Sequence, residues 1–530
     1  MLASLRIVAT YPVFSQTYDE VAHIATGMEW LDQGTYAYEP LHPPLARVAV
    51  ALGPFLDGRN SQGKPDMWQE GPAILGQGPT YYRTLTLARL GILPFFWVAC
   101  LVVYCWGSRY YDEQVACLAV FIFSMLPPIL AHSGLATTDM ALTAMVGAAF
   151  LTAAIWCEQP NLPRTLGLGL TTALAVLSKF SALAFLPAAG LAAGAGYLWT
   201  EKPSMSALAV QIQVRARWLL LSVITALLLI WAGYRFSVGT LNLPGGHFFI
   251  PFPELFLGLQ QLAEHERLGA LNYLFGRLST DGWWYYYFID LGVKTPLSVL
   301  ILASIGVAAC VRTPQSYTRW LALAFSSGIL VLCIFNHINL GIRHILPVYI
   351  GLSLLAAAGT AALINLGRRK RAAYWIAGGL LLELTTSSAL SHPDYLAYFN
   401  PLAGAHPERI VIDSDLDWGQ DMKRLALRLR ELDVKQVAFT SCKATSPAAL
   451  GLPPLTPTDF LHPSPGWNAI DLTALEFMAA TTRIRYPQLQ LWPELIPPTE
   501  RIGKSILLFH FPDTLPPLPA ALPVAHLYCP

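Results

Sequence analysis

Two adjacent carboxylates, Asp19 and Glu20, come early in a chain that is otherwise mostly apolar. Neighbouring carboxylates oppose each other's ionisation unless a cation intervenes, so such a pair suits a general base. The alternative is a solvated helix N-terminus, where the helix dipole favours acidic residues. His23 follows Glu20 by three positions on the same helical face, a spacing that metal ligands use. The pair therefore predicts acid and base chemistry, with a metal ligand as a second interpretation of His23.

His42 precedes two prolines in the sequence His42-Pro43-Pro44-Leu45. The prolines fix φ and remove two backbone donors, which holds His42 in an extended segment. The stretch "LARVAVALGPFL" that follows is amphipathic and is expected to lie along the membrane surface. Taken alone, a histidine before two prolines is more often a turn residue than a ligand.

Three basic residues, Arg47, Lys179 and Arg343, are candidates for holding an anion. Guanidinium and ammonium groups are the usual partners of phosphate oxygens. Lys179 interrupts the apolar run 166–199, where a cation is costly and therefore indicates function. The alternative for Arg343 is a side chain that reaches the membrane surface from a helix end.

The 530 residues are 54% hydrophobic and only 13% charged, which is outside the range of ordinary soluble proteins. The apolar runs predict a mainly α, polytopic membrane protein with about 11 spans. In this count residues 1–15 are the outer part of a first helix, and Lys179 divides its run into two helices. The basic loops then fall on one side, which the positive-inside rule makes cytoplasmic. Residues 16–84, residues 238–290 and everything after Leu390 share the outer face.

Residues 391–530 differ abruptly in composition and predict a small extracytoplasmic α/β domain. The segments "RIVIDSDLD", "KQVAFTS" and "SILLFHF" have the pattern of strands, and "DMKRLALRLREL" has that of a helix. The acidic stretch "DSDLDWGQD" fails as a calcium loop, because Trp418 and Arg424 occupy positions that need Gly and Glu. We expect Asp417 or a neighbour to cap the following helix. Cys442 and Cys529 are expected to pair if the domain faces an oxidising compartment.

The order of these motifs resembles that of the GT-C glycosyltransferases. Asp-Glu at the outer end of the first helix, followed about twenty residues later by [His/Lys]-Pro-Pro-Leu, resembles the first outer loop of protein O-mannosyltransferases and of the lipid A aminoarabinose transferases. The second group has Lys where this chain has His42. The resemblance continues in "LATTDMALTAM" around Asp139, "ALAVLSKFSAL" around Lys179, "YYYFIDLGVKTPL", and "GIRHILPVYI" around Arg343.

This resemblance implies a GT-C-like transmembrane catalytic domain over residues 1–390, with outer loops 16–84 and 238–290, and an appended domain over 391–530. It implies transfer of a sugar from a polyprenyl-phosphate donor to a protein, lipid or glycan at the outer face of the bacterial cytoplasmic (inner) membrane. The reaction needs a base for the acceptor hydroxyl and cations for the departing phosphate.

The roles that follow are expectations. Asp19 is the general base, and the reaction inverts the anomeric carbon. Glu20 orients the acceptor or tunes the base. The donor phosphate is held by His42, Lys179, Arg343 and Arg47. Asp139 and His23 are candidates for binding the acceptor or a divalent metal, and metal dependence is left open.

Two other functions are compatible with parts of this pattern. Oligosaccharyltransferase-type transfer of a whole glycan uses a related donor. A lipid or sugar transporter needs no base, but transporters tend to show inverted repeats and ionisable groups near the bilayer midplane. Here no repeat is found, and the ionisable groups gather on one face. Lys+Arg (34) and Asp+Glu (33) nearly cancel, so nothing indicates a nucleic acid partner.

Overall fold

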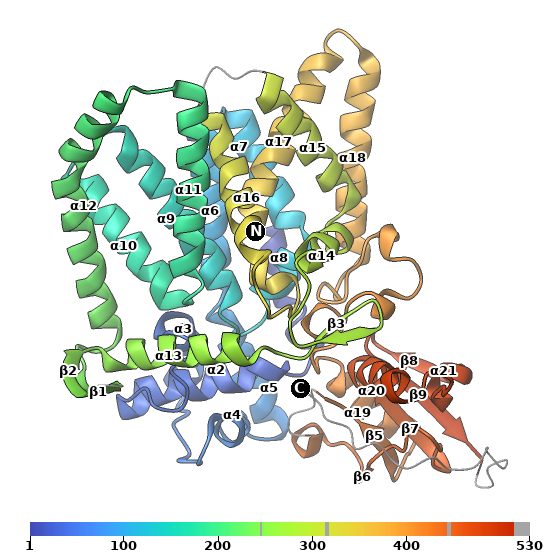
Figure 1. Cartoon of the computed structure of the whole chain (residues 1–530). Helices are drawn as coiled ribbons and strands as arrows, with labels where there is room; N and C mark the ends of the chain where they lie inside the picture. Colours follow the sequence, from blue (N-terminus) through green and yellow to red (C-terminus); the bar gives the residue numbers. More distant parts are fainter. Residues whose placement is uncertain (244–245, 313–316, 443–446, 513–530) are drawn as a thin grey trace.

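The computed structural model describes residues 1–243, 246–312, 317–442 and 447–512. Its larger part is a bundle of upright helices, and its smaller part is an α/β domain below one side of the bundle (Figure 1). The upright helices are α6 (Leu93–Tyr110), α7 (Glu113–Met125), α9 (Asp139–Glu158), α10 (Leu162–Ser178), α11 (Ala182–Glu201), α12 (Met205–Gly233), α15 (Leu297–Arg312), α16 (Leu321–Cys333), α17 (Val348–Gly367) and α18 (Arg371–Leu390).

Five helical stretches in the described residues are long and apolar enough to cross a membrane. The number rises to seven if each of two bent helix pairs counts as one span. One pair is α7 with α8 (Pro127–Ser133), and the other is α14 (Tyr286–Lys294) with α15. The predicted count of about 11 is therefore not confirmed, because several apolar runs form helices too short for the bilayer.

The predicted break at Lys179 is confirmed. Helix α10 ends at Ser178 and α11 begins at Ala182, with Lys179 in an extended conformation between them. Helices α11 and α12 are the most exposed of the five candidate spans, since the most apolar segment of each is only 17% buried inside the protein. Their exposed apolar side chains are what a lipid-facing surface requires.

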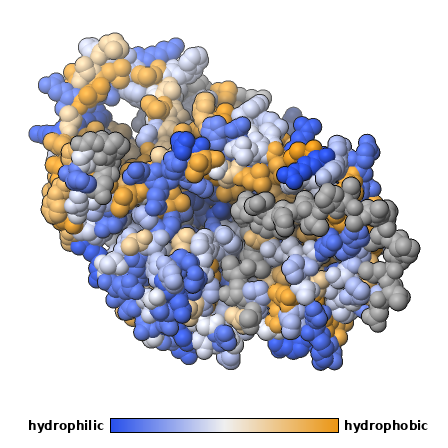
Figure 2. All heavy atoms as spheres, turned by 60° about the horizontal axis from the view of Figure 1, so that its bottom comes forward, coloured by the Kyte–Doolittle hydropathy of each residue, from blue (hydrophilic) through white to orange (hydrophobic). Residues whose placement is uncertain are grey.

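A layer of shorter elements crosses the lower ends of the upright helices, on the side of the C-terminal domain (Figure 1). Hydrophilic side chains cover most of this face, which is hollowed near its centre (Figure 2). The elements of the layer are α2 (Tyr18–Met28), α3 (Pro44–Leu56), α4 (Met67–Leu75), α5 (Gly78–Leu90), the hairpin β1 (Val238–Leu243) and β2 (Gly246–Pro251), and α13 (Pro253–Leu268). Pro44 starts α3, as expected for a proline in the first turn of a helix.

The C-terminal domain contains a five-stranded mixed sheet in the order β6-β5-β7-β9-β8. Its elements are α19 (Met422–Glu431), β5 (Val437–Thr440), β6 (Leu455–Thr456), β7 (Gly466–Asp471), α20 (Leu472–Arg485), α21 (Trp492–Leu495), β8 (Glu500–Ile502) and β9 (Ile506–Phe511). The helix predicted from "DMKRLALRLREL" and the strands predicted from "KQVAFTS" and "SILLFHF" are confirmed.

The strand predicted from "RIVIDSDLD" is wrong. Its first residue ends the 3-10 helix η5 (Pro407–Arg409), and its centre forms the 3-10 helix η6 (Asp413–Asp415). Asp413 has a φ of 59°, and the carbonyl of Asp415 accepts a hydrogen bond from Lys294 Nζ instead of from a neighbouring strand. The predicted cap is also wrong, because Asp421 precedes α19 without a capping bond and Asp417 accepts from the Thr473 N–H of α20. The predicted pairing of Cys442 involves Cys529, which lies outside the described residues.

Helices α15 and α17 pack closely because small residues face each other. A Cβ atom added to Gly306 would lie 1.9 Å from the Leu355 carbonyl oxygen, and one added to Gly359 would lie 2.0 Å from that of Leu302. We therefore expect Gly306→Ala to separate the two helices and to cost about 1 to 3 kcal/mol of stability. Thermal unfolding of the purified protein in detergent measures this as a lower Tm.

Gly378→Ala on α18 is the matched control, since a Cβ atom there meets nothing within 4 Å. An alanine at this position is expected to leave Tm unchanged or to raise it, because Ala is the better helix former. Equal Tm values for the two variants would contradict the proposed close packing.

Candidate active site

The first turn of α2 holds Asp19 against a cation from a distant part of the chain. Asp19 Oδ2 lies 2.9 Å from Arg343 Nη1, although the two residues are 324 positions apart. Their side chains are 25% and 12% exposed, so the pair lies at the edge of the protein interior and can be reached from outside. Arg343 belongs to the single turn η3 (Ile342–Ile345), which leads into α17.

Glu20 has a different environment from its neighbour. It is fully buried and forms a two-pronged ion pair with Arg89 of α5, with both contacts at 2.8 Å. Its carboxylate also accepts from the Thr17 N–H at 2.7 Å and from the Ala136 N–H at 2.8 Å. Glu20 therefore joins α2 to α5 and to the turn before α9, and it fixes the helix turn that carries Asp19.

Lys179 and Asp139 form a second ion pair at the same end of the bundle. Lys179 Nζ lies 2.7 Å from Asp139 Oδ1, and the two side chains are 10% and 1% exposed. Asp139 also interacts electrostatically with Arg343, which places the two ion pairs near each other. The break between α10 and α11 thus brings a costly cation to the end of the bundle beside the layer of shorter elements, where a carboxylate compensates it.

His42, Arg47 and His23 form a third group. The rings of His23 and His42 are 5.5 Å apart, and Arg47 Nε donates to His23 Nδ1 at 3.1 Å. The other Arg47 nitrogens donate to Tyr36 Oη, to backbone carbonyls and to Glu39. Arg47 is only 1% exposed. Its guanidinium is thus committed to internal bonds that orient the segment before α3.

Burial decides the charge state of the histidines here. It lowers the pKa of His42, and it lowers the pKa of His23 and His344 well below the usual value. Burial opposes the ionisation of Glu39, but the Arg47 guanidinium outweighs it, and the pKa of Glu39 falls to about 2. At neutral pH these imidazoles are therefore uncharged, and Lys179 and Arg343 supply the positive charge that faces the site.

The C-terminal segment completes the surroundings of Arg343. Arg343 Nε lies 3.1 Å from Ser414 Oγ, and the Arg343 guanidinium carbon lies 4.4 Å from the centre of the Trp418 ring, a cation–π distance. Asp415 Oδ1 accepts from the Ile342 N–H at 3.0 Å, and Tyr18 N–H donates to the Trp418 carbonyl at 3.0 Å. The stretch "DSDLDWGQD" is therefore part of the site's framework.

Seven of the eight predicted residues thus fall into three contacting groups, which are Asp19 with Arg343, Lys179 with Asp139, and His42 with Arg47 and His23. The eighth, Glu20, pairs with Arg89 instead. Sequence reasoning missed Arg89, Glu39, Ser414 and Trp418. Glu39 could have been found from the sequence, because it precedes His42 by three positions. In the structure, its Oε2 lies 3.4 Å from His42 Nδ1. Nothing in the local pattern identified Arg89 or Trp418.

A metal centre is not supported by the donors present. Among the described residues, no group of three or more His, Cys, Asp or Glu side chains is arranged to hold a metal ion. The Glu-x-x-His pairs Glu20/His23 and Glu39/His42 have the right spacing, but each carboxylate is engaged by an arginine of its own. Arg89 pairs with Glu20, and Arg47 pairs with Glu39. No chemical step is therefore assigned to a metal.

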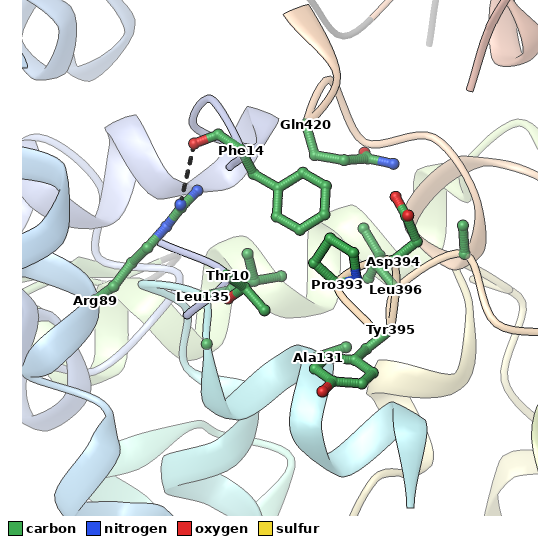
Figure 3. A pocket seen from close by; sticks show the side chains of 12 residues that line it. Thr10, Phe14, Arg89, Ala131, Leu135, Pro393, Asp394, Tyr395, Leu396 and Gln420 are labelled. Atoms are coloured by element: carbon green, nitrogen blue, oxygen red, sulfur yellow. Dashed lines mark hydrogen bonds between the residues drawn. The ribbon is translucent and has the colours of Figure 1, made fainter. Parts of the chain in front are cut away.

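A separate cavity is bordered by Arg89 (Figure 3). Phe14, Leu135 and Tyr395 line it, and Arg89 borders it while donating to the Phe14 carbonyl at 3.2 Å. Asp19, Lys179 and Arg343 are not among its lining residues. The cavity is thus distinct from the candidate site.

No protein-family model and no curated protein matches this sequence. Among solved structures, ArnT from Cupriavidus metallidurans matches in the apo state with a TM-score of 0.51 and 13% identity, and in a complex with undecaprenyl phosphate with 0.50 and 12%. Both matches cover 96% of this chain and 96% of ArnT. The Archaeoglobus fulgidus oligosaccharyltransferase matches with a TM-score of 0.47 and 11% identity, over 91% of this chain and 69% of that one.

The chain therefore has the fold of ArnT, and the resemblance to GT-C glycosyltransferases is confirmed at the level of the fold. Identity this low carries the fold but not the activity.

The buried Glu20–Arg89 pair leads to a stability prediction. Breaking a buried ion pair by removing one partner leaves an uncompensated charge, which typically costs about 3 to 5 kcal/mol. We expect Arg89→Met to lower Tm strongly. Arg83→Met on the same helix removes an arginine that is 71% exposed and pairs with Asp57 at the surface, so Tm should hardly change. Equal losses in the two variants would show that the Glu20–Arg89 pair does not hold α2 in place.

Gly341 leads to a second prediction, because it combines a φ of 94° with close neighbours. A Cβ atom there would lie 2.7 Å from Ser414 Oγ and 2.8 Å from Asp415 Oδ2. We expect Gly341→Ala to push residues 413–418 away from Arg343. Hydrogen exchange followed by mass spectrometry should show faster exchange in that segment.

Gly404→Ala is the control for backbone strain, since Gly404 also has a positive φ, of 69°, but has no atom within 4 Å of its added Cβ. Its segment 413–418 should keep the exchange rate of the unmodified protein. Unchanged exchange in Gly341→Ala as well would contradict the packing of Gly341 against that segment.

Proposed function

We propose that this protein is a membrane glycosyltransferase that moves a sugar from a polyprenyl-phosphate donor to an acceptor hydroxyl at the outer face of the bacterial inner membrane. The observation that carries the proposal is the Asp19–Arg343 pair, a carboxylate and a guanidinium held together at the outer end of an ArnT-like bundle. A base and a phosphate-binding cation are the two groups this reaction needs, and here they are in contact. The ArnT structure bound to undecaprenyl phosphate supports this class of donor.

Asp19 acts as the general base. Its carboxylate takes the proton of the acceptor hydroxyl as that oxygen attacks the anomeric carbon of the donor sugar. The bond between the anomeric carbon and the phosphate oxygen breaks, and polyprenyl phosphate leaves with the electron pair. Attack from the face opposite the phosphate inverts the configuration. Arg343 holds the Asp19 carboxylate in position for this step.

Arg343 and Lys179 neutralise the phosphate that leaves. Each is beside a carboxylate and has further N–H donors, so it can bind a phosphate oxygen while it keeps its carboxylate partner. His42 is uncharged and is 25% exposed at its side chain, so it contributes a hydrogen bond and no charge.

The remaining residues position these groups. Glu20 fixes the first turn of α2, Asp139 orients Lys179, and Arg47 with His23 orients His42. The acceptor is a hydroxyl of a protein, lipid or glycan that reaches the site from the hydrophilic face shown in Figure 2.

Asp19→Asn tests the role of the base. The amide keeps the shape of the side chain but cannot accept the proton, so the transfer rate should fall by about a hundredfold or more, the usual contribution of a general base. Transfer from a radiolabelled undecaprenyl-phosphate sugar in proteoliposomes, with acceptor-containing membrane extract, measures this rate.

Asp57→Asn is the control, because Asp57 also pairs with an arginine in the first outer loop but lies outside the site. Its transfer rate should stay within about twofold of the unmodified protein, as for a surface ion pair of little energetic weight. Undiminished transfer by folded, inserted Asp19→Asn would exclude Asp19 as the base.

A further inference from the structure

The end of α8, the turn that follows it and the start of α9 contain three buried polar atoms that the proposed mechanism does not use. They are His132 Nδ1, Thr137 Oγ1 and Asp139 Oδ2, and none has a hydrogen-bond partner among the described residues. The three residues are 1%, 0% and 1% exposed. An unsatisfied buried polar group costs about 1 to 3 kcal/mol, so three within eight residues indicate a binding site.

The turn itself is held firmly by other bonds. The Ala136 N–H donates to Glu20 at 2.8 Å, and Ser133 Oγ donates to the Ile129 carbonyl at 2.6 Å. Asp139 uses its Oδ1 for Lys179 and leaves Oδ2 without a partner. The three atoms are therefore held on a rigid segment, as recognition of a ligand requires.

The turn adjoins the groups proposed to hold the phosphate. The His132 ring lies 6.4 Å from the ring of Trp418, which stacks on Arg343. Asp139 interacts electrostatically with Arg343 and His132, and it contacts Lys179 directly. A molecule whose phosphate lies between Lys179 and Arg343 would thus present its sugar to this turn.

We propose that His132, Thr137 and Asp139 form the sugar-binding subsite of the donor, and that the sugar is uncharged and rich in hydroxyl groups. This inference rests on the proposed function. A sugar hydroxyl can donate to Asp139 Oδ2, while Thr137 Oγ1 and His132 Nδ1 exchange hydrogen bonds with neighbouring hydroxyls. Because Lys179 already compensates Asp139 and Arg343 already pairs with Asp19, no carboxylate of these pairs is free to compensate an amino sugar.

Thr137→Val tests the subsite, because it keeps the branched shape and removes only an unpartnered hydroxyl. The full-length protein in nanodiscs is titrated with undecaprenyl phosphate and with undecaprenyl-phosphate glucose. We expect about fivefold to tenfold weaker binding of the glycosylated lipid, as for the loss of one hydrogen bond, and unchanged binding of the bare lipid. Tm should not fall, since no protein hydrogen bond is lost.

Thr143→Val is the matched control. Thr143 is also a buried threonine of this region, but its hydroxyl donates to the Asp139 carbonyl within α9 at 2.8 Å. Both lipids should bind this variant as they bind the unmodified protein.

Three outcomes would overturn the inference. If Thr137→Val weakens both lipids equally, or neither, the turn does not contact the sugar. If undecaprenyl-phosphate aminoarabinose binds more tightly than the glucose lipid, the sugar is not an uncharged one. If the unmodified protein binds no undecaprenyl-phosphate lipid and transfers no sugar, the proposed function fails as well, so the two failures are distinguishable.

Discussion

Compensation of charge within an apolar helical bundle is the constraint on which this structure depends. A lone charge buried in such a bundle is costly, so each one requires a partner with suitable geometry. Three pairs meet this requirement at one end of the bundle, namely Glu20 with Arg89, Asp139 with Lys179, and Asp19 with Arg343. The partners come from different elements, so pairing them fixes how α2, α5, the α10–α11 break and η3 lie together.

The three pairs differ in solvent exposure. This difference separates a pair that stabilises the fold from one that a substrate can reach. Glu20 and Arg89 are sealed from solvent, whereas Asp19 keeps a quarter of its side chain exposed. The C-terminal segment contributes to the same arrangement, since Ser414 and Trp418 both contact the Arg343 guanidinium. The C-terminal domain thus belongs to the framework of the site, although composition suggests a boundary near residue 390.

Sequence reasoning could predict those features whose cause is local. Lys179 interrupts an apolar run, so the helix break could be inferred from energetic cost alone. Asp19 and Arg343 could each be proposed, but their contact spans 324 positions and depends on the packing of the whole bundle. Arg47 was expected to reach a phosphate, and only the structure shows that its nitrogens bind internal partners. The strand expected over residues 409–417 failed because an alternating pattern does not reveal a positive φ at Asp413 or a carbonyl bound by Lys294.

The most direct test of the central claim is a structure of this protein in nanodiscs with undecaprenyl phosphate. The proposed arrangement predicts phosphate oxygens within hydrogen-bonding distance of Arg343 and Lys179, with the Asp19 carboxylate beside them on the hydrophilic face. A phosphate bound instead in the cavity lined by Phe14, Leu135 and Tyr395, with both ion pairs intact, would contradict it.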